Sequence, residues 1–234
     1  IDKVNITSAG NATDFGDLLT GTYAGGAVGS TTRGVMGGTS SGNQLQYVTF
    51  ATASNATDFG DLSVDRSLSN AASNSTRGLF FGGSDNGPSY TRTDVVDYIA
   101  IDTTGNATDF GNLIRAITSG AGFASTTRAI HGGGPFGGGT SRSDQIEYYT
   151  IDSTGNGTDF GDLSAGKKNV NGCSSNTRGI FAGGYTVSNS VIDVIEYITI
   201  ANTGDVTDFG DLTAATSNMN GCTSNQTTAV MHRT

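Results

Sequence analysis

Hydrophobic and polar residues follow one four-phrase pattern in successive segments of this chain. The most regular phrase, as in 96–101 and 195–200, is rich in β-branched and aromatic residues and places apolar side chains on both faces of a strand. Another phrase begins at Thr-Arg and runs through apolar residues into paired glycines. No segment has the spacing of an amphipathic helix. The pattern predicts short β-strands, four to a repeat, and essentially no helix.

The phrase TDFG sets the repeat length and occurs five times. Its phenylalanines recur at intervals of 44 to 51 residues, which is the length of one supersecondary unit. In four copies an arginine follows the preceding TDFG Phe by 18 residues, so the phrases stay in register. We therefore predict four whole units, at about 23–62, 67–113, 119–163 and 168–212.

The two ends of the sequence together supply the strands of a fifth unit. Residues 1–6 align with 195–200, which is a third strand, while 218–222 resembles a first strand and 227–232 a degraded second strand. We predict a unit built from 217–234 plus 1–18, because pairing these ends would close a ring and remove its open edges. The alternative is a slice of a longer array.

Four strands per unit, with glycines ending the second strand, resemble the kelch repeat of β-propellers. Phe stands where kelch repeats carry Trp, and the chain has no Trp. The resemblance implies an all-β fold: a five-bladed β-propeller of four-stranded antiparallel blades, forming a single domain over 1–234 and closed by pairing of the N- and C-terminal strands. The motif residues are Gly37–Gly38, Gly82–Gly83, Gly132–Gly133 and Gly183–Gly184, with Tyr47, Tyr98, Tyr148 and Tyr197 on the third strands.

Each TDFG phrase supplies a large apolar side chain and an acid. We expect the phenylalanines to fill the wedge between neighbouring sheets. We expect the aspartates to pair with the arginines of the Thr-Arg phrase across unit junctions, since Arg binds carboxylates in a directional way. The fifth arginine position holds Thr227, so the fifth unit should be the weakest. The phenylalanines are Phe15, Phe59, Phe110, Phe160 and Phe209, each preceded by its aspartate.

Net charge bears on the classes of binding partner, and the two cysteines raise the question of a disulfide. Lys and Arg total 12 against 21 Asp and Glu, a net charge of −9 that disfavours nucleic acid and anionic membrane surfaces. No apolar run is long enough to span a bilayer. Cys173 and Cys222 occupy equivalent positions in successive units. Two buried free thiols are the favoured interpretation, and a disulfide between units stays open.

Catalytic and metal-binding constellations are not found in the sequence. His131 takes a position held by Met or Phe in other units, so it is interpreted as an isolated substitution. The acids of TDFGD lie three positions apart, which on a regular strand sends them to opposite faces, so hydrogen bonding is favoured over calcium binding. We expect no enzyme, no cofactor and no metal site.

The connections after the paired glycines differ between units and are the candidate ligand-binding loops. Aromatic faces and cations there suit sugar rings or a protein epitope, while the alternative is that these loops are solvated connectors. The candidate binding residues are Tyr90, Arg92, Phe136, Arg142 and Tyr185.

A second resemblance concerns the biological role. The phrases TGNATDFGNL (104–113) and TGNGTDFGDL (154–163) are similar to repeats in structural and tail-fibre-like proteins of marine bacteriophages. This implies an extracellular component on a virion surface. The leading hypothesis is a non-enzymatic adhesion or decoration module that binds a host-surface glycan or receptor. The alternative is a purely structural module that docks other virion proteins, and an enzyme ranks third.

Overall fold

The structure, a computed structural model, describes the backbone of residues 1–234 apart from positions 6, 22–24, 39–41, 86, 88, 138–140, 218–220, 225–227 and 233–234. Side chains are also not described at 221–224 and 230–232. The described residues form strands and no helix, so none of them belongs to a helix able to cross a membrane. The predicted all-β fold is confirmed.

Four antiparallel sheets of four strands each form the body of the molecule, and each lies within one predicted unit. Sheet 1 contains β3 (Ala27–Gly29), β4 (Arg33–Met36), β5 (Gln44–Thr49) and β6 (Thr57–Asp61). Sheet 2 contains β7 (Asn70–Ser73), β8 (Arg77–Phe81), β9 (Val95–Ala100) and β10 (Thr108–Asn112). Sheet 3 contains β11 (Ala121–Ala124), β12 (Arg128–Gly132), β13 (Gln145–Thr150) and β14 (Thr158–Asp162). Sheet 4 contains β16 (Asn171–Ser174), β17 (Arg178–Ala182), β19 (Val194–Thr199) and β20 (Thr207–Asp211).

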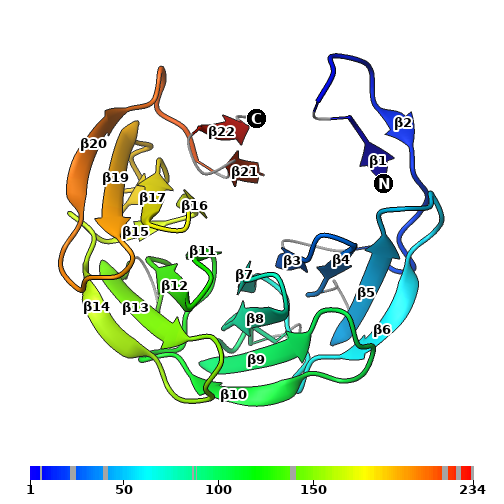
Figure 1. Ribbon diagram of the computed structural model, residues 1–234. Helices are drawn as coiled ribbons and strands as arrows, with labels where there is room; N and C mark the ends of the chain where they lie inside the picture. The colour runs from blue at the N-terminus through cyan, green and yellow to red at the C-terminus, as the bar shows by residue number, and fades with distance from the viewer. Residues whose placement is uncertain are drawn as a thin grey trace.

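Three pairs of shorter strands complete the description. β1 (Asp2–Lys3) pairs with β2 (Thr13–Asp14), in the register that Glu196 and Tyr197 have with their fourth strand. β21 (Gly221–Ser224) pairs with β22 (Ala229–His232), and β15 (Lys167–Lys168) with β18 (Tyr185–Thr186), a pair that was not predicted. The two terminal pairs lie on opposite sides of a gap in an otherwise ring-like arrangement (Figure 1). The predicted joining of the terminal strands into one sheet is therefore not formed among the described residues.

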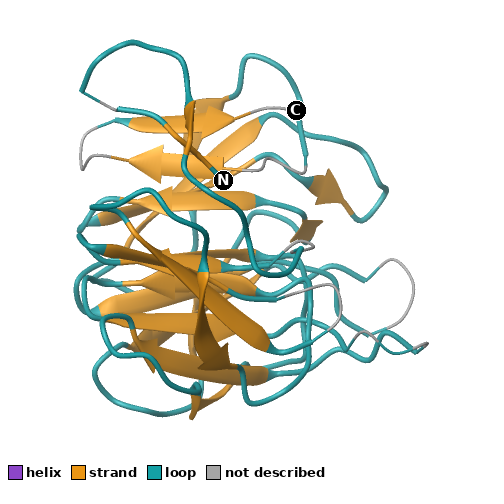
Figure 2. Cartoon of the chain, turned by 90° about the vertical axis from the view of Figure 1, so that its right-hand side faces the viewer, coloured by secondary structure: helices purple, strands orange, loops and turns teal. Residues whose placement is uncertain are grey.

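The first strands of the sheets lie side by side around the centre of the arc. β7 lies next to β3 and β11, and β16 lies next to β11 and β21 (Figure 1). Small residues permit this approach: a Cβ at Gly122 would lie 2.7 Å from the Ala71 carbonyl oxygen. Loops leave the sheets toward two opposite sides (Figure 2). The turns between first and second strands are on one side, and the loops after the paired glycines are on the other.

The TDFG phenylalanines form the core between neighbouring sheets, as predicted, with one exception. Phe59, Phe110 and Phe160 are each 2% exposed, and Phe15 is also buried. Each lies close to an aromatic or cationic side chain of the third strand, as in the edge-on contact of Tyr47 with Phe59 at 5.9 Å. Phe209 is 49% exposed because no described sheet packs against its outer side.

The arginines of the Thr-Arg phrase do not pair with the TDFG aspartates, so that prediction is wrong. The Arg33 guanidinium stacks on Tyr47 at 4.2 Å, and its Nη1 donates to the Ile101 carbonyl of the next sheet at 3.1 Å. The aromatic face and the carbonyl offer Arg33 partners that need no buried ion pair. Three of the aspartates, Asp14, Asp109 and Asp208, instead accept the N–H two residues later in their own phrase, as from Gly111 to Asp109 at 3.1 Å. Arg77 and Arg128 repeat both contacts, and Arg178 repeats the stacking on Tyr197.

Neighbouring sheets are joined by a recurring set of three hydrogen bonds, called here the clasp. Between sheets 1 and 2, the Gly105 N–H donates to the Phe59 carbonyl and the Ala107 N–H to the Asp61 carbonyl, both at 2.7 Å. The Asp61 N–H donates to the Asn106 side-chain oxygen at 3.1 Å. The turn before each TDFG thus docks on the preceding sheet. Equivalent bonds join Gly155, Asn156 and Gly157 to Phe110 and Asn112, and Gly204, Asp205 and Val206 to Phe160 and Asp162.

The glycine of TDFG is required by the clasp. Gly60 has a φ of +140° at a bulge between β5 and β6, a conformation that favours glycine. A Cβ at Gly60 would lie 2.4 Å from the carbonyl of Gly105. The motif therefore encodes the junction between sheets as well as the strand.

Cys173 is buried and disulfide-bonded. The favoured interpretation as a free thiol is therefore wrong for this residue. Cys222 lies in β21, outside the part of the chain whose side chains are described.

Candidate functional site

The loops that connect second and third strands in sheets 2, 3 and 4 carry all five predicted binding residues. We call these loops, residues 84–94, 135–144 and 185–193, the GG loops. Their entry is fixed by the glycine pair, whose second N–H donates to the linker that leads to the next sheet, as from Gly83 to the Ile117 carbonyl at 2.9 Å. In sheet 3 the equivalent pair is Gly133–Gly134, not Gly132–Gly133 as predicted. Counting five residues from the arginine would have found it, since Arg77 precedes Gly82 by the same distance.

Tyr90 stands at the tip of the first GG loop and is 68% exposed. The loop is closed below it by hydrogen bonds between Asp85 and Thr91, at 2.9 Å through the backbone and 2.8 Å through the Asp85 carboxylate. Tyr90 itself has a φ of +45°, which is unusual for a residue with a side chain and is held by these contacts. The loop therefore presents an exposed aromatic side chain on a backbone that these bonds hold in place.

Arg92 and Arg142 brace neighbouring GG loops against one another. Arg92 Nη1 donates to the Gly137 carbonyl in the loop of sheet 3. Arg142 Nη2 donates to the Asn189 side-chain oxygen in the loop of sheet 4 at 3.1 Å. Both arginines are half-buried. The structure thus brings the three loops together and gives the two predicted cations a positioning role.

Phe136 and Tyr185 each lie beneath a cation that the sequence analysis did not single out. The Arg115 guanidinium lies 4.6 Å from the Phe136 ring centre, and the Lys168 ammonium lies 5.1 Å from that of Tyr185. Phe136 also packs against the buried Ile117. Arg115 and Lys168 could have been found from their place in the sequence, because both lie in linkers that follow a fourth strand, and these linkers meet the GG loops.

Two of the linkers bury a charged side chain where they meet the next sheet. Arg66 and Asp97 form an ion pair at 2.9 Å, and both side chains are fully buried. Burial lowers the pKa of Arg66, and the Asp97 carboxylate raises it in part. Lys167 and Glu196 form the equivalent pair between sheets 3 and 4.

His131 has a specific partner and is not an isolated substitution. It is buried, and its Nδ1 lies 3.2 Å from the Glu147 carboxylate. The same carboxylate accepts the Ile114 N–H at 2.9 Å. Burial first, and Glu147 second, raise the pKa of the neighbouring Tyr149. The group links β12 and β13 to the linker that follows β10.

Acidic side chains gather at the outer edge of the sheets. Burial, together with the carboxylates of Asp144, Asp205 and Asp159, raises the pKa of Asp162. Among the described residues, no group of three or more His, Cys, Asp or Glu side chains is placed to hold a metal ion.

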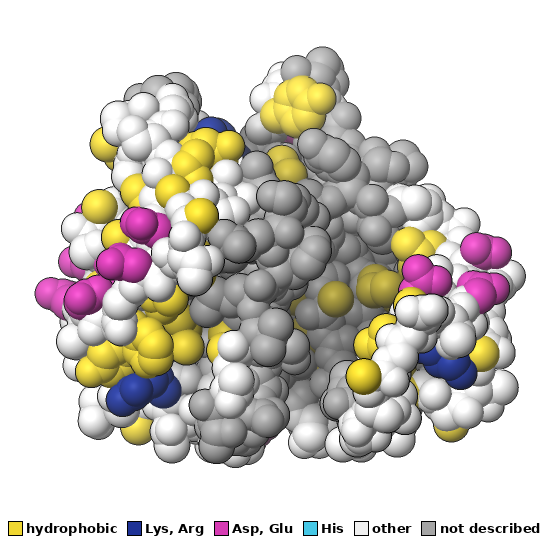
Figure 3. All heavy atoms as spheres, turned by 90° about the horizontal axis from the view of Figure 1, so that it is seen from above, with side chains coloured by type: hydrophobic (Ala, Val, Ile, Leu, Met, Phe, Trp, Pro, Cys, Tyr) yellow, Lys and Arg dark blue, Asp and Glu magenta, His cyan; other side chains and the backbone are white. Residues whose placement is uncertain are grey.

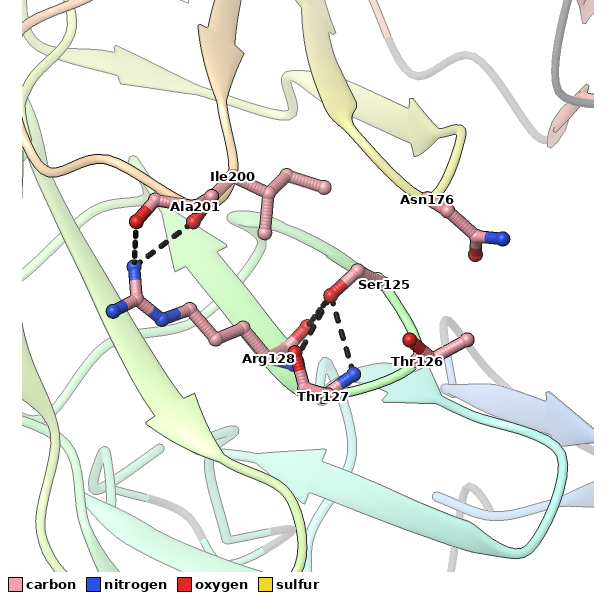
Figure 4. A pocket seen from close by; sticks show the side chains of 7 residues that line it. All are labelled: Ser125, Thr126, Thr127, Arg128, Asn176, Ile200 and Ala201. Atoms are coloured by element: carbon pink, nitrogen blue, oxygen red, sulfur yellow. Dashed lines mark hydrogen bonds between the residues drawn. The ribbon is translucent and has the colours of Figure 1, made fainter.

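A shallow cavity of about 300 Å³ lies on the opposite side of the molecule from the GG loops, between sheets 3 and 4 (Figure 4). The Ser125 hydroxyl accepts the N–H groups of Thr127 and Arg128 at 3.3 and 3.1 Å. Arg128 reaches across the junction to the carbonyls of Ile200 and Ala201, both at 3.0 Å. These residues are occupied in holding the two sheets together.

Neither a protein-family model nor a curated protein matches the sequence.

Proposed function

We propose that the chain is a non-enzymatic adhesion or decoration module on a virion surface, which binds host-surface glycans through the GG loops. One observation carries the proposal: three successive loops on one side are braced by Arg92 and Arg142, and the first of them exposes Tyr90. Braced loops lose little conformational freedom on binding, which favours affinity.

The chemistry of the GG loops suits a sugar ligand. An exposed ring such as Tyr90 can stack on the apolar face of a pyranose, and the cations Arg115 and Lys168 can donate to its hydroxyl or carboxylate oxygens. The net charge of −9 disfavours nucleic acid as a ligand.

The fold proposed for this module is a five-bladed β-propeller. Sheets 1 to 4 are four blades, and the fifth combines β21–β22 with β1–β2. Two contacts support this assignment. β21 lies beside β16, where the first strand of the next blade is expected. The Asp17 backbone N–H donates to the Asn55 side-chain oxygen at 2.9 Å, which is a clasp bond to sheet 1.

The test is binding of the purified chain to a microbial glycan array. Tyr90→Ala is the informative variant. Phe50→Ala is its matched control, because Phe50 is a similarly exposed aromatic residue in a turn on the opposite side. We expect saturable binding that Tyr90→Ala removes and Phe50→Ala preserves, with both variants folded by circular dichroism.

Two results would contradict the proposal. Equal loss in both variants would show that the GG loops are not the binding side. Absence of binding at high protein concentration would favour the alternative, a structural module that docks other virion proteins, whose variants would lose incorporation into particles.

A further inference from the structure

Sheet 4 carries one half of a clasp to which none of the described residues is bound. In sheets 1 to 3, the carbonyl of the TDFG Phe and the N–H and carbonyl two residues later bind the turn of the next sheet. The corresponding groups of Phe209 and Asp211 make none of these bonds among the described residues. A Cβ at Gly210 would meet nothing within 4 Å, whereas at Gly16 and Gly60 it would meet backbone at 2.3 and 2.4 Å.

The N-terminal segment carries the other half. Gly10, Asn11 and Ala12 repeat the sequence of the docking turn Gly105–Asn106–Ala107 and are exposed. No described residue makes the clasp bonds to them. The same segment exposes an apolar side chain, since Val4 is 60% exposed while its counterparts Ile99 and Ile198 are buried.

The N-terminal segment also carries the carboxylate that the other junctions use. Asp97, Glu147 and Glu196 each accept the N–H of the residue after the TDFGDL or TDFGNL phrase of the preceding sheet. Asp2 occupies their position in the N-terminal segment and is exposed, and the corresponding N–H belongs to Thr213.

Lys3 shows a matching adjustment. Its ammonium lies 5.8 Å from the Phe15 ring. In the other sheets the cation near the aromatic residues is an arginine of the second strand, which lies over the Tyr of the third strand, as Arg33 does over Tyr47. The fifth arginine position holds Thr227. The segment thus carries its own cation for a unit whose second strand has none.

We infer that the outer side of sheet 4 is a docking site for residues 1–12 of the same chain. The Gly10 N–H donates to the Phe209 carbonyl, the Asp211 N–H to the Asn11 side chain, and the Ala12 N–H to the Asp211 carbonyl. Docking covers Phe209 and Val4 and closes the gap in Figure 1. The side on which the gap opens shows hydrophobic, acidic and basic side chains on both flanks (Figure 3), and the new bonds follow the pattern of the formed clasps. The inference rests on the closed five-bladed fold proposed above and not on any ligand.

The test is cross-linking within one chain. The variant pair is Asn11→Cys with Asp211→Cys, and the matched control is Asn106→Cys with Asp61→Cys, which spans a formed clasp. A short bismaleimide should link both pairs inside a monomer, as seen by light scattering and by migration on a denaturing gel. Linkage at the control pair alone would overturn the inference, as would linkage of 11 to 211 between two copies of the chain.

Thermal unfolding provides a second readout that needs no reagent. Asn11→Ala should lower the unfolding midpoint about as much as Asn106→Ala, because each removes one clasp bond. An unchanged midpoint in Asn11→Ala beside a lowered one in Asn106→Ala would contradict docking. Glycan binding is measured separately on the GG loops, so failure here leaves that proposal standing.

Discussion

The buried pair Arg66–Asp97 gives the most demanding prediction about the junctions between sheets. Arg66 lies in the linker that follows sheet 1, and it donates to Asp97 at 2.9 Å, to the Val95 carbonyl at 3.1 Å and to the Phe80 carbonyl at 3.3 Å. Arg66→Ala removes all three bonds and leaves the Asp97 carboxylate buried with the Ser63 N–H as its remaining donor, at 3.0 Å. The linker and sheet 2 should therefore separate.

Removing one partner of a buried ion pair costs about 3–5 kcal/mol, mainly because the remaining charge is desolvated and unpaired. In a chain of this length that corresponds to a fall of about 6–20 °C in the unfolding midpoint. Arg33→Ala is the matched control, because Arg33 also reaches the next sheet but is half-exposed. Its loss should lower the free energy of unfolding by about 1.5–2 kcal/mol, the sum expected for one carbonyl bond and one cation–π contact.

The chain itself suggests a compensating change. Gln46 occupies the position of Asp97 in sheet 1, is equally buried, and accepts the Leu19 N–H at 2.7 Å without any charge. The double variant Arg66→Met with Asp97→Gln should therefore recover more than half of the stability lost in Arg66→Ala. The assay is urea unfolding followed by circular dichroism. A loss below about 1 kcal/mol in Arg66→Ala, or no recovery in the double variant, would refute the reasoning.

Three further predictions concern single positions. Gly60→Ala should lower the free energy of unfolding by about 3 kcal/mol, because of backbone strain and the clash with Gly105. Gly155→Ala, where a Cβ meets nothing within 4 Å, should be tolerated. Equal unfolding midpoints in the two variants would contradict the clasp. The folded-state pKa of Tyr149 is raised, so the folded chain keeps a proton that the unfolded chain releases above about pH 10. The free energy of unfolding should therefore fall by about 1.4 kcal/mol per pH unit above that pH. Tyr149→Phe should remove this slope when unfolding is measured from about pH 9 to 11. A reductant should remove the Cys173 disulfide, which lowers the free energy of unfolding by about 2–4 kcal/mol and with it the calorimetric midpoint; an unchanged midpoint would count against that bond.

The strands could be predicted from the sequence because their signals are local. The β-branched third strands and the glycines that end the second strands place sheets 1 to 4 correctly, and the fixed position of Phe59 and its equivalents predicts their burial. The partners across junctions could not be predicted in the same way. Asn106 resembles any turn residue until its bond to Asp61 is known, and Arg33 has an aspartate and a carbonyl as equally plausible acceptors.

The sequence predicted where the candidate loops lie along the chain, but not which residues of neighbouring loops contact one another. Variable aromatic and cationic residues after the glycines were sufficient to find Tyr90, but the bracing by Arg92 depends on how closely the loop of sheet 3 approaches. Whether the sheets close into a ring could not be predicted from one repeat, because it depends on small rotations between successive sheets that accumulate over the whole arc.

The measurement that tests the account most directly is amide hydrogen exchange at the clasps. The N–H groups of Asp61, Asn112 and Asp162 donate to side chains of the next repeat, at 3.1, 3.1 and 3.0 Å. We predict strong protection at all three, and in Asn106→Ala a selective loss of protection at Asp61 while the other two stay protected. Rapid exchange at all three in the unmodified chain would contradict the claim that this motif holds the sheets together.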